Sequence, residues 1–313
     1  MSALLAIPIA LFVAAIYFLR TRRLPRSSSP VTREPSATTT TRDDETPRVI
    51  AIDWSGAKTG ARNKIVLAEA AGGTLLNLEG GRDREQLVDY LIELAEQHPK
   101  LIIGMDFAFS FPSWFLTERG FSRVHELWAV ADKEAESWLA TCEPPFWGRP
   151  GKKRPDMTDD QHFRKTDRDV PAQAGIRPKS VFQIGGAGAV GTGSLRGMPF
   201  LLRLHQAGFS IWPFDPPGPH TIIEIWPRLL TGPVNKTSAT DRAAYLQRLE
   251  QPLRPKDLAE ASASDDAFDA AVAAISMSDH VANLANLPRV SDSKMLLEGV
   301  IWHPDLQGVL AKS

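Results

Sequence analysis

Short apolar segments that end in a turn or an acidic residue recur from Arg48 onward, and the stretches between them have helical periodicity. Runs of about four to eight apolar residues are typical of buried strands, whereas DREQLVDYLIELAEQH (83–98) repeats apolar side chains every three or four positions and predicts a helix. The strands predicted in the first half are VIAIDWSG (49–56), KIVLAEA (64–70), TLLNLEG (74–80) and LIIGMDFAF (101–109). Three strands with tight turns, then a helix and a fourth strand, predict a mixed sheet whose first and fourth strands are neighbours.

The same alternation resumes after an interruption. A Trp-rich helical stretch (114–140) and a polar loop (141–180) predict an insertion over about residues 113–180. Further strands are predicted at 181–184, 209–215 and 221–227, and further helices near 195–207, 239–250 and 265–278. Residues 48–313 are therefore expected to form one α/β domain that contains the insertion.

The first 47 residues have a different composition. An apolar run from Ala3 to Leu19 is followed by Arg20, Arg22 and Arg23, which predicts a single-pass transmembrane anchor over residues 1–23 with the arginine side in the cytoplasm. A cleaved signal peptide would carry positive charge before the apolar run, and here the charge comes after it. Residues 24–47, rich in Pro, Ser and Thr, predict a disordered linker. The alternative is an overlong predicted start, in which case the protein is cytoplasmic.

Composition excludes several classes of protein. The net charge of −1 gives no chain-wide basic field for nucleic acid or anionic lipid. The single cysteine, Cys142, excludes an internal disulfide framework and a four-cysteine zinc site. No HExxH, GxSxG or GxxxxGK[ST] motif occurs, and the seven histidines show no metal-ligand spacing along the sequence.

Acidic residues at strand ends and on one late helix are the main chemical signal. Asp53 and Asp106 each follow an apolar strand, Glu224 lies within a third, and Asp265, Asp266 and Asp269 share one face of a helix. Taken singly, Asp265 could cap its helix and Glu224 could pair with Arg228. Together, carboxylates at the carboxyl ends of adjacent strands predict a site for a hard divalent cation.

The segments VIAIDWSGAK, LIIGMDFAFSFP, IEIWPRLL and SDDAFDAAVAAIS, in this order over residues 48–302, resemble domain-of-unknown-function family 429, regarded as predicted nucleases. The resemblance implies an RNase H-like fold, with a mixed five-stranded sheet and helices on both faces. It also implies two Mg²⁺ or Mn²⁺ ions held by Asp53 on the first strand, Asp106 on the fourth, and Asp266 and Asp269 on the late helix. Asp265 is a further metal-ligand candidate.

Roles in phosphodiester hydrolysis follow from that resemblance. Asp53 would bridge the ions, Asp106 and Asp269 would complete the coordination, and Asp266 or Glu224 would hold a water molecule. Lys58, just beyond the first strand, would neutralise the charge on the departing oxygen.

A glycine-rich turn offers a rival interpretation. Gly186, Gly188 and Gly191 form a GxGxxG pattern between the predicted strand VFQI and a helix, which is typical of a dinucleotide site. However, the strand that would supply the ribose-binding acid ends at Asp215, 29 residues after Gly186, and two prolines follow it. We therefore expect the turn to bind phosphate or a nucleic-acid backbone through its amides.

The loop from Arg149 to Arg168 holds seven basic residues against four aspartates and follows Phe146 and Trp147. It predicts either backbone contacts with nucleic acid or an ordinary solvated loop. The candidate contacts are Arg149, Lys152, Lys153 and Arg164. Trp54 and Trp226, close in sequence to Asp53 and Glu224, are expected to line a pocket.

The sequence thus favours a membrane-tethered, Mg²⁺- or Mn²⁺-dependent nuclease or phosphodiesterase with a nucleic acid or nucleotide as substrate. Two alternatives stay open. A nucleotide-dependent phosphotransferase or ATP-binding protein of a related fold would need a second domain of comparable size. A catalytically silent nucleic-acid-binding scaffold would bind without the acids and show no turnover.

Overall fold

The structure, a computed structural model, describes residues 46–306. Among these residues, no helix is long and apolar enough to cross a membrane. The predicted anchor (1–23) and nearly all of the predicted linker (24–47) lie outside the described residues, so both stay predictions.

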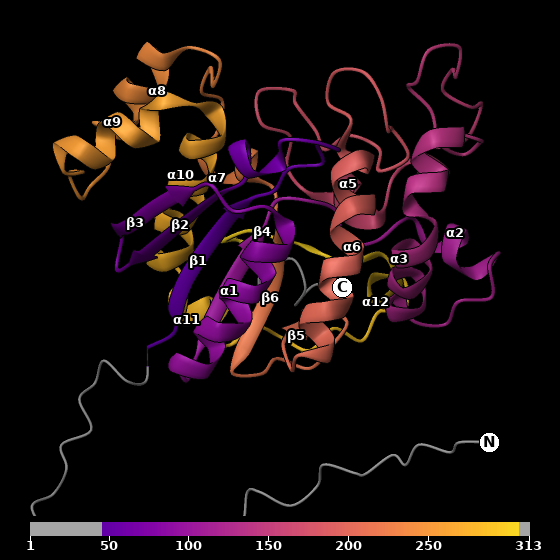
Figure 1. The fold of residues 1–313 in the computed structure, drawn as a ribbon, viewed down its shortest axis with the longest axis horizontal. Coiled ribbons are helices and arrows are strands. Elements are labelled where there is room, and N and C mark those ends of the chain that lie inside the picture. The colour runs from indigo at the N-terminus through magenta and orange to yellow at the C-terminus, as the bar shows by residue number, and fades with distance from the viewer. Residues whose placement is uncertain (1–45, 307–313) are drawn as a thin grey trace, which may run out of the picture. The chain divides into compact units, whose positions relative to one another are not determined.

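One mixed sheet forms the centre of the described chain (Figure 1). Its strands are β1 (Arg48–Asp53), β2 (Val66–Ala71), β3 (Thr74–Gly80), β4 (Leu101–Met105), β5 (Ser210–Ile211), β6 (His220–Ile225) and β7 (Ile301–Trp302). The order is β3-β2-β1-β4-β6-β5, and β7 also pairs with β6. β1, β2 and β3 are antiparallel neighbours, whereas β1, β4 and β6 run parallel. The predicted mixed sheet is confirmed, and so is the pairing of its first and fourth strands.

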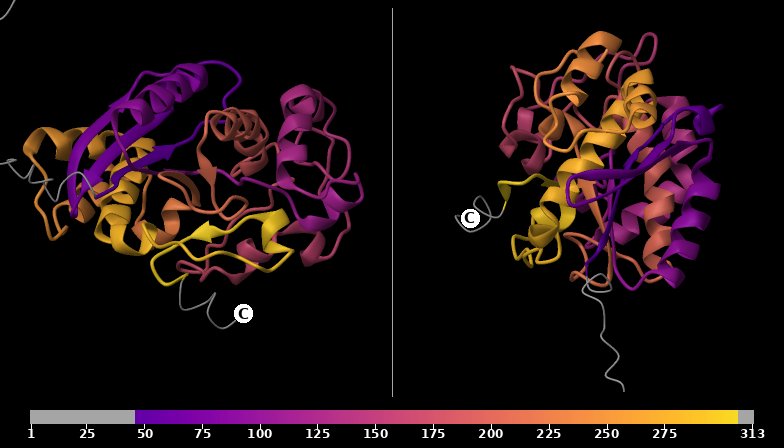
Figure 2. Two further views of the ribbon diagram at one scale, coloured as in Figure 1. Left: turned by 90° about the horizontal axis from the view of Figure 1, so that it is seen from below. Right: turned by 90° about the vertical axis from the view of Figure 1, so that its left-hand side faces the viewer.

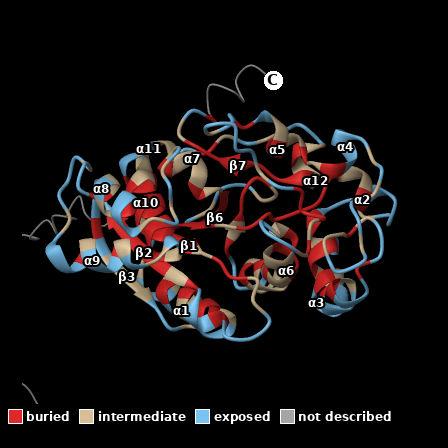
Figure 3. Cartoon of the chain, turned by 90° about the horizontal axis from the view of Figure 1, so that it is seen from above, coloured by how far each residue is buried: buried red, intermediate tan, exposed pale blue. Residues whose placement is uncertain are grey.

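Helices cover both faces of this sheet (Figure 2). The longer ones are α1 (Arg84–Gln97), α3 (Val124–Thr141), α6 (Val190–Gln206), α8 (Ala239–Leu246), α9 (Pro255–Ala263) and α10 (Asp265–Asp279). The short ones are η2 (Ala61–Asn63), α2 (Ser113–Thr117), α4 (Asp159–His162), α5 (Lys165–Asp169), α7 (Pro227–Thr231), α11 (Val281–Leu284) and α12 (Met295–Glu298). Buried residues follow the strands and α10, whereas α9 is largely exposed (Figure 3).

The period of two along β1 divides its side chains between two cores. Ile50 and Ile52 pack with α1, α3 and α6, whereas Val49 and Ala51 pack with α10. The next residue with the parity of Val49 and Ala51 is Asp53. When β1 is paired on both sides, the Asp53 carboxylate therefore lies on the face of the sheet that α10 covers.

α10 packs directly on the sheet because small residues line the contact. A Cβ atom on Gly104 of β4 would lie 2.7 Å from Met277 Sδ and 2.9 Å from Ile225 Cγ2, so no larger residue fits there without a shift. On the helix, four alanines are almost fully buried: Ala270, Ala271, Ala273 and Ala274. Close packing fixes the position of α10, and with it the position of its acidic first turn.

Several predicted boundaries are corrected. The segment 181–184 is a turn with one bridge from Gln183 to Trp147 and not a strand, and the strand predicted at 209–215 is reduced to β5. The sheet has seven strands instead of five, because two-residue strands flank β6. The loop predicted at 141–180 contains α4 and α5. Short strands were misjudged because a segment that pairs over only two residues has too little periodicity to be recognised in the sequence.

Candidate active site

Asp53 and Asp106 lie side by side at the carboxyl ends of two parallel strands. Asp53 ends β1 and Asp106 follows β4, and the Asp106 amide donates to the Ile52 carbonyl at 3.0 Å. Ile52 pairs with Met105, so each aspartate occupies the next position of its strand. Both aspartates therefore have the parity of the residues that face α10.

The start of α10 brings further carboxylates to this edge. Ser264 caps the helix by accepting from the Ala267 amide at 3.0 Å, and Asp266 and Asp269 follow one turn apart. Asp269 is 7% exposed, which is low for a charged residue and requires a partner. Its Oδ2 accepts a hydrogen bond from Lys236 Nζ, while its Oδ1 is buried and accepts none from the described residues.

Lys236 is the site residue that sequence analysis missed. It lies between α7 and α8 in a segment without periodicity, KTSATD, and nothing in its neighbours marks it. Its charge acts on Asp53, Asp106, Asp266 and Asp269. One ammonium group thus acts on all four carboxyls, while Lys64 acts on Asp266 and Arg228 acts on Asp269 as well.

The negative charges of the four carboxyls destabilise one another. Loss of water raises the pKa of Asp53 well above its usual value, and the charges of Asp106, Asp269 and Asp266 raise it further against the opposing effect of Lys236. Burial, followed by the charge of Asp269, raises the pKa of Asp106 to about 7. Burial also raises the pKa values of Asp266 and Asp269. When the four carboxyls are ionised, their negative charge therefore exceeds the positive charge that the neighbouring side chains supply.

This excess of negative charge predicts a pH effect on the metal-free protein. In the folded chain Asp106 keeps its proton up to about pH 7, whereas in the unfolded chain it releases the proton near pH 4. The folded state binds more protons in this window, so its stability falls as pH rises through it. Relative to Asp106→Asn, we expect the parent to lose about 1–2 kcal/mol of unfolding free energy between about pH 5 and pH 7. Urea unfolding in chelator at both pH values measures it, and a pH-independent difference would contradict it.

Glu224 points to the other face of the sheet, but it lines the same cleft as Asp106, and its charge contributes to the raised pKa of Asp106. It pairs with Met105, so its side chain shares the face of Ile52 and not that of Asp53. Glu224 Oε1 and Oε2 accept from the two terminal nitrogens of Arg164 at 2.6 and 2.7 Å, and Oε2 also accepts from the Phe109 amide at 2.9 Å. The suggested partner Arg228 instead donates to the carbonyls of Gly232 and Val234.

Arg164 is correspondingly held by two carboxylates. Its side chain is 2% exposed, and its Nη2 also contacts Asp167 Oδ1 at 2.8 Å. The two carboxylates raise the pKa of the guanidinium despite its burial, so it stays charged. Arg164 ties α5 to β6 and also lines the cleft beside Asp106, and its role in phosphate binding stays a prediction.

A substitution separates this structural pair from the acidic cluster. Glu224→Gln removes one charge but keeps an oxygen for the Phe109 amide, and Asp167 still balances Arg164. We expect unfolding free energy to fall by about 1–2 kcal/mol, by the same amount with and without Mg²⁺. Thermal unfolding under both conditions measures it. A loss that Mg²⁺ changes would return Glu224 to the metal-binding set.

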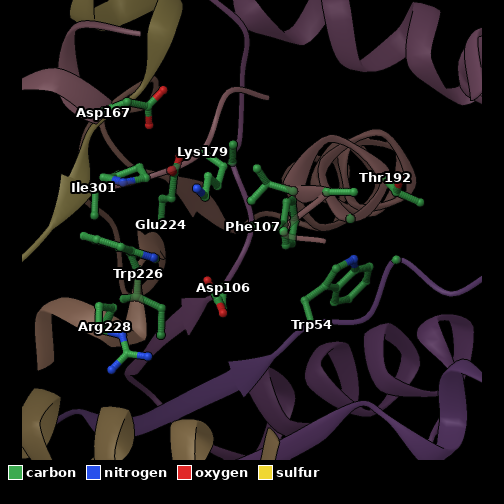
Figure 4. A pocket seen from close by; sticks show the side chains of 18 of the residues that line it. Trp54, Asp106, Phe107, Asp167, Lys179, Thr192, Glu224, Trp226, Arg228 and Ile301 are labelled. Atoms are coloured by element: carbon green, nitrogen blue, oxygen red, sulfur yellow. The ribbon is translucent and has the colours of Figure 1, made fainter. Parts of the chain in front are cut away.

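A cleft of about 720 Å³ opens beside Asp106 (Figure 4). Trp54 and Phe107 lie on one side of Asp106, and Trp226 and Arg228 lie on the other. Trp54 and Trp226 thus line a pocket, as the sequence predicted. Five more basic residues line the cleft: Lys64, Arg164, Arg177, Lys179 and Lys236.

The glycine-rich turn borders the same cleft. Gly186 and Gly188 line it together with the first turn of α6, which holds no acidic residue. Gly191 does not line it: a Cβ atom there would lie 2.0 Å from the Val181 carbonyl, so Gly191 permits close packing. Because 181–184 is not a strand and Asp215 contacts two histidines, the strand–turn–helix context of a dinucleotide site is missing.

The other predicted contacts lie elsewhere. Lys58 is exposed and its Nζ lies 3.9 Å from Glu136 Oε2, so Lys236 and not Lys58 accompanies the acids. Asp265 is exposed at the first position of α10. Arg149 and Lys153 are exposed, Lys152 Nζ contacts Glu143 Oε1 at 2.6 Å, and none of these three lines the cleft.

The chain was compared with protein-family models, curated proteins and solved structures. No protein-family model, curated protein or solved structure matches the chain.

Proposed function

We propose that this protein is a divalent-metal-dependent phosphodiesterase or nuclease, and that the acids at the ends of β1 and β4 and on α10 form its active site. The observation that carries the proposal is the meeting of Asp53, Asp106, Asp266 and Asp269 around one ammonium group, with every carboxyl pKa raised. Such a surplus of buried negative charge persists in a fold where it serves a function, because it costs stability otherwise.

An RNase H-like fold is part of the proposal. The order β3-β2-β1-β4-β6, antiparallel at one edge and parallel beyond it, agrees with the sheet that the sequence resemblance implies. The acids occupy the first strand, the fourth strand and the late helix of that arrangement. This agreement of position and chemistry favours the nuclease over a phosphotransferase, which would need a second domain of comparable size.

The donors suit Mg²⁺ or Mn²⁺. All are carboxylate oxygens, the ligands that hard cations prefer, and Asp269 Oδ1 is buried without a hydrogen-bond partner among the described residues. Asp53, Asp106 and Asp269 would hold two ions, with Asp266 at the outer side. Their oxygens would have to move closer together on binding, because among the described residues no three of these acids have ligand atoms within 4.8 Å of one another. When bound, the ions would supply an activated water and stabilise the oxygen that leaves phosphorus.

The chain's own residues would bind and orient an anionic substrate. Arg177 and Lys179 are exposed at the rim of the cleft, and the half-buried Arg228 lies beside Trp226 inside it. At the start of α6 the Val190 and Gly191 amides already donate to the Gly188 and Gln183 carbonyls, so a phosphate there would be bound by the partial positive charge of the helix start and by the basic side chains around it. Trp54 and Trp226 flank Asp106, and the partly exposed Trp226 offers aromatic surface to a base, whereas Trp54 is buried against Phe107 and Phe200. Lys236 would neutralise negative charge that develops next to Asp269.

Activity of the full-length chain on a substrate panel tests the proposal. The panel contains single- and double-stranded DNA, RNA, an RNA–DNA hybrid, a branched DNA junction and a dinucleotide, each with Mg²⁺, Mn²⁺ or chelator. We expect cleavage of at least one of these substrates with either metal and none with chelator. Cleavage that survives chelator would refute the metal mechanism. Binding without turnover on every substrate would favour the scaffold, and nucleotide-dependent phosphate transfer would favour the phosphotransferase.

A further inference from the structure

Two histidines and an aspartate from separate parts of the chain meet beyond the acidic cleft. His125 lies in the first turn of α3, His205 in the last turn of α6, and Asp215 follows β5. Thr192 at the start of α6 lines the cleft, and the 13 residues from there to His205 span about 20 Å along the helix. The histidine cluster is therefore separate from the proposed active site.

The ligand atoms of these residues lie close enough to share one ion. One such atom from each residue lies within 4.8 Å of the others. His125 Nε2 is 3.3 Å from Asp215 Oδ1, and His205 Nδ1 is 3.0 Å from Asp215 Oδ2. Zinc binds nitrogen and oxygen at about 2.0–2.1 Å, so two ligands of a tetrahedral zinc lie about 3.3 Å apart. Each histidine thus lies at about that distance from one oxygen of Asp215, Oδ1 for His125 and Oδ2 for His205.

The surroundings of His125 indicate a missing partner. Both of its ring nitrogens are buried, and neither makes a hydrogen bond with good geometry to any described residue. The ring is held against the buried Trp128, with centroids 4.9 Å apart, and against His205, with centroids 4.2 Å apart. Nδ1 has no partner among the described residues, and Nε2 approaches only Asp215 Oδ1 without hydrogen-bond geometry. A buried imidazole in this state is costly, and coordination of one nitrogen removes part of that cost.

A backbone hydrogen bond holds the Asp215 carboxylate in place beside the two histidines. Its Oδ2 accepts from the Ile211 amide at 2.9 Å, which fixes the carboxylate. A carboxylate beside two imidazoles is a donor set that suits zinc.

We propose that His125, His205 and Asp215 bind one zinc ion, with a water molecule in the fourth position. Zinc there would join the start of α3, the end of α6 and the connection between β5 and β6. The sequence shows no metal-ligand spacing because the three ligands come from elements that only the tertiary structure brings together. This proposal does not depend on the proposed nuclease activity.

Zinc titration of the full-length chain, purified in detergent after treatment with chelator, tests the site. A chromophoric competitor measures the dissociation constant, and cobalt(II) absorption reports whether the coordination is four- or six-fold. The variants are His205→Gln and Asp215→Asn, and the matched control is His220→Gln, which alters a histidine outside the cluster. Asp53→Asn separates this site from the acidic cleft.

We expect one zinc ion per chain, four-coordinate cobalt absorption, and a rise in melting temperature on zinc binding. Loss of even an outer-shell partner costs about 10–100-fold in metal affinity, so we expect His205→Gln and Asp215→Asn to weaken zinc binding by about 100-fold or more. His220→Gln and Asp53→Asn should bind zinc like the parent. Unchanged affinity in both ligand variants, six-coordinate cobalt or loss of zinc in Asp53→Asn would overturn the proposal. Each would leave Asp215 as a hydrogen-bond acceptor for two histidines.

Discussion

Asp53→Asn is expected to abolish metal-dependent cleavage and at the same time to stabilise the metal-free protein. The side chain keeps its shape but loses a charge that the neighbouring acids repel, and burial raises the pKa of this carboxyl more than any other effect does. We expect the metal-free unfolding free energy to rise by about 1–2 kcal/mol. Cleavage should fall on the order of 1,000-fold, because a bridging ligand is lost. The Mg²⁺-induced rise in melting temperature should disappear.

The matched control is Asp132→Asn, which makes the same chemical change on the exposed surface of α3. It should leave cleavage, melting temperature and the Mg²⁺ response unchanged. Thermal unfolding with chelator and with Mg²⁺, together with cleavage rates, gives all three quantities. If Asp53→Asn cleaves like the parent, the mechanism is wrong. If it lowers the metal-free melting temperature, the carboxylates do not repel one another as the structure indicates.

Lys236→Met is expected to destabilise the metal-free protein and to increase its response to Mg²⁺. Lys236 and Asp269 form a largely buried pair, with side chains 17% and 10% exposed, and the same ammonium offsets the charge of Asp53 and Asp106. Removing one partner of a buried pair costs about 3–5 kcal/mol, and some remaining exposure reduces this to about 2–4 kcal/mol. A divalent cation bound by the same acids would restore part of this loss.

The control here is Lys256→Gln, an exposed lysine on α9 whose Nζ lies 3.7 Å from Glu260 Oε1. It should change stability by less than about 0.5 kcal/mol in chelator or Mg²⁺. Melting temperatures over a Mg²⁺ titration should rise more steeply for Lys236→Met than for the parent. Parallel titration curves would show that Lys236 is only a structural partner of Asp269.

The placement of Asp53 and Asp106 is decided locally. Each follows an apolar strand, and the period of two fixes the face that each side chain takes once the strands are parallel neighbours. The acidic face of α10 is equally local, because residues three and four apart share a helix face. Sequence analysis could therefore predict that these acids meet at one edge of the sheet.

Glu224 shows where the same reasoning fails. Its position on a strand was read correctly, but the face it takes depends on its register with Met105, and its partner Arg164 comes from a loop 60 residues away. No periodic pattern marks Arg164, because loop contacts have no period. The side chains of Arg149, Lys152 and Lys153 in the basic loop lie outside the cleft, and the sequence could not place them because exposed side chains in a loop have no preferred face.

The sequence by itself determined the strand and helix alternation, the parity of the acids and the capped start of α10, because these depend on neighbours a few residues away. Only the tertiary structure decided that Lys236 pairs with Asp269 and that Arg164 pairs with Glu224. It also decided that His125, His205 and Asp215 lie together. Those contacts join residues that are distant along the chain. Which distant residues come into contact depends on how whole helices and strands pack against one another, and a sequence pattern of period two or 3.6 does not encode that packing.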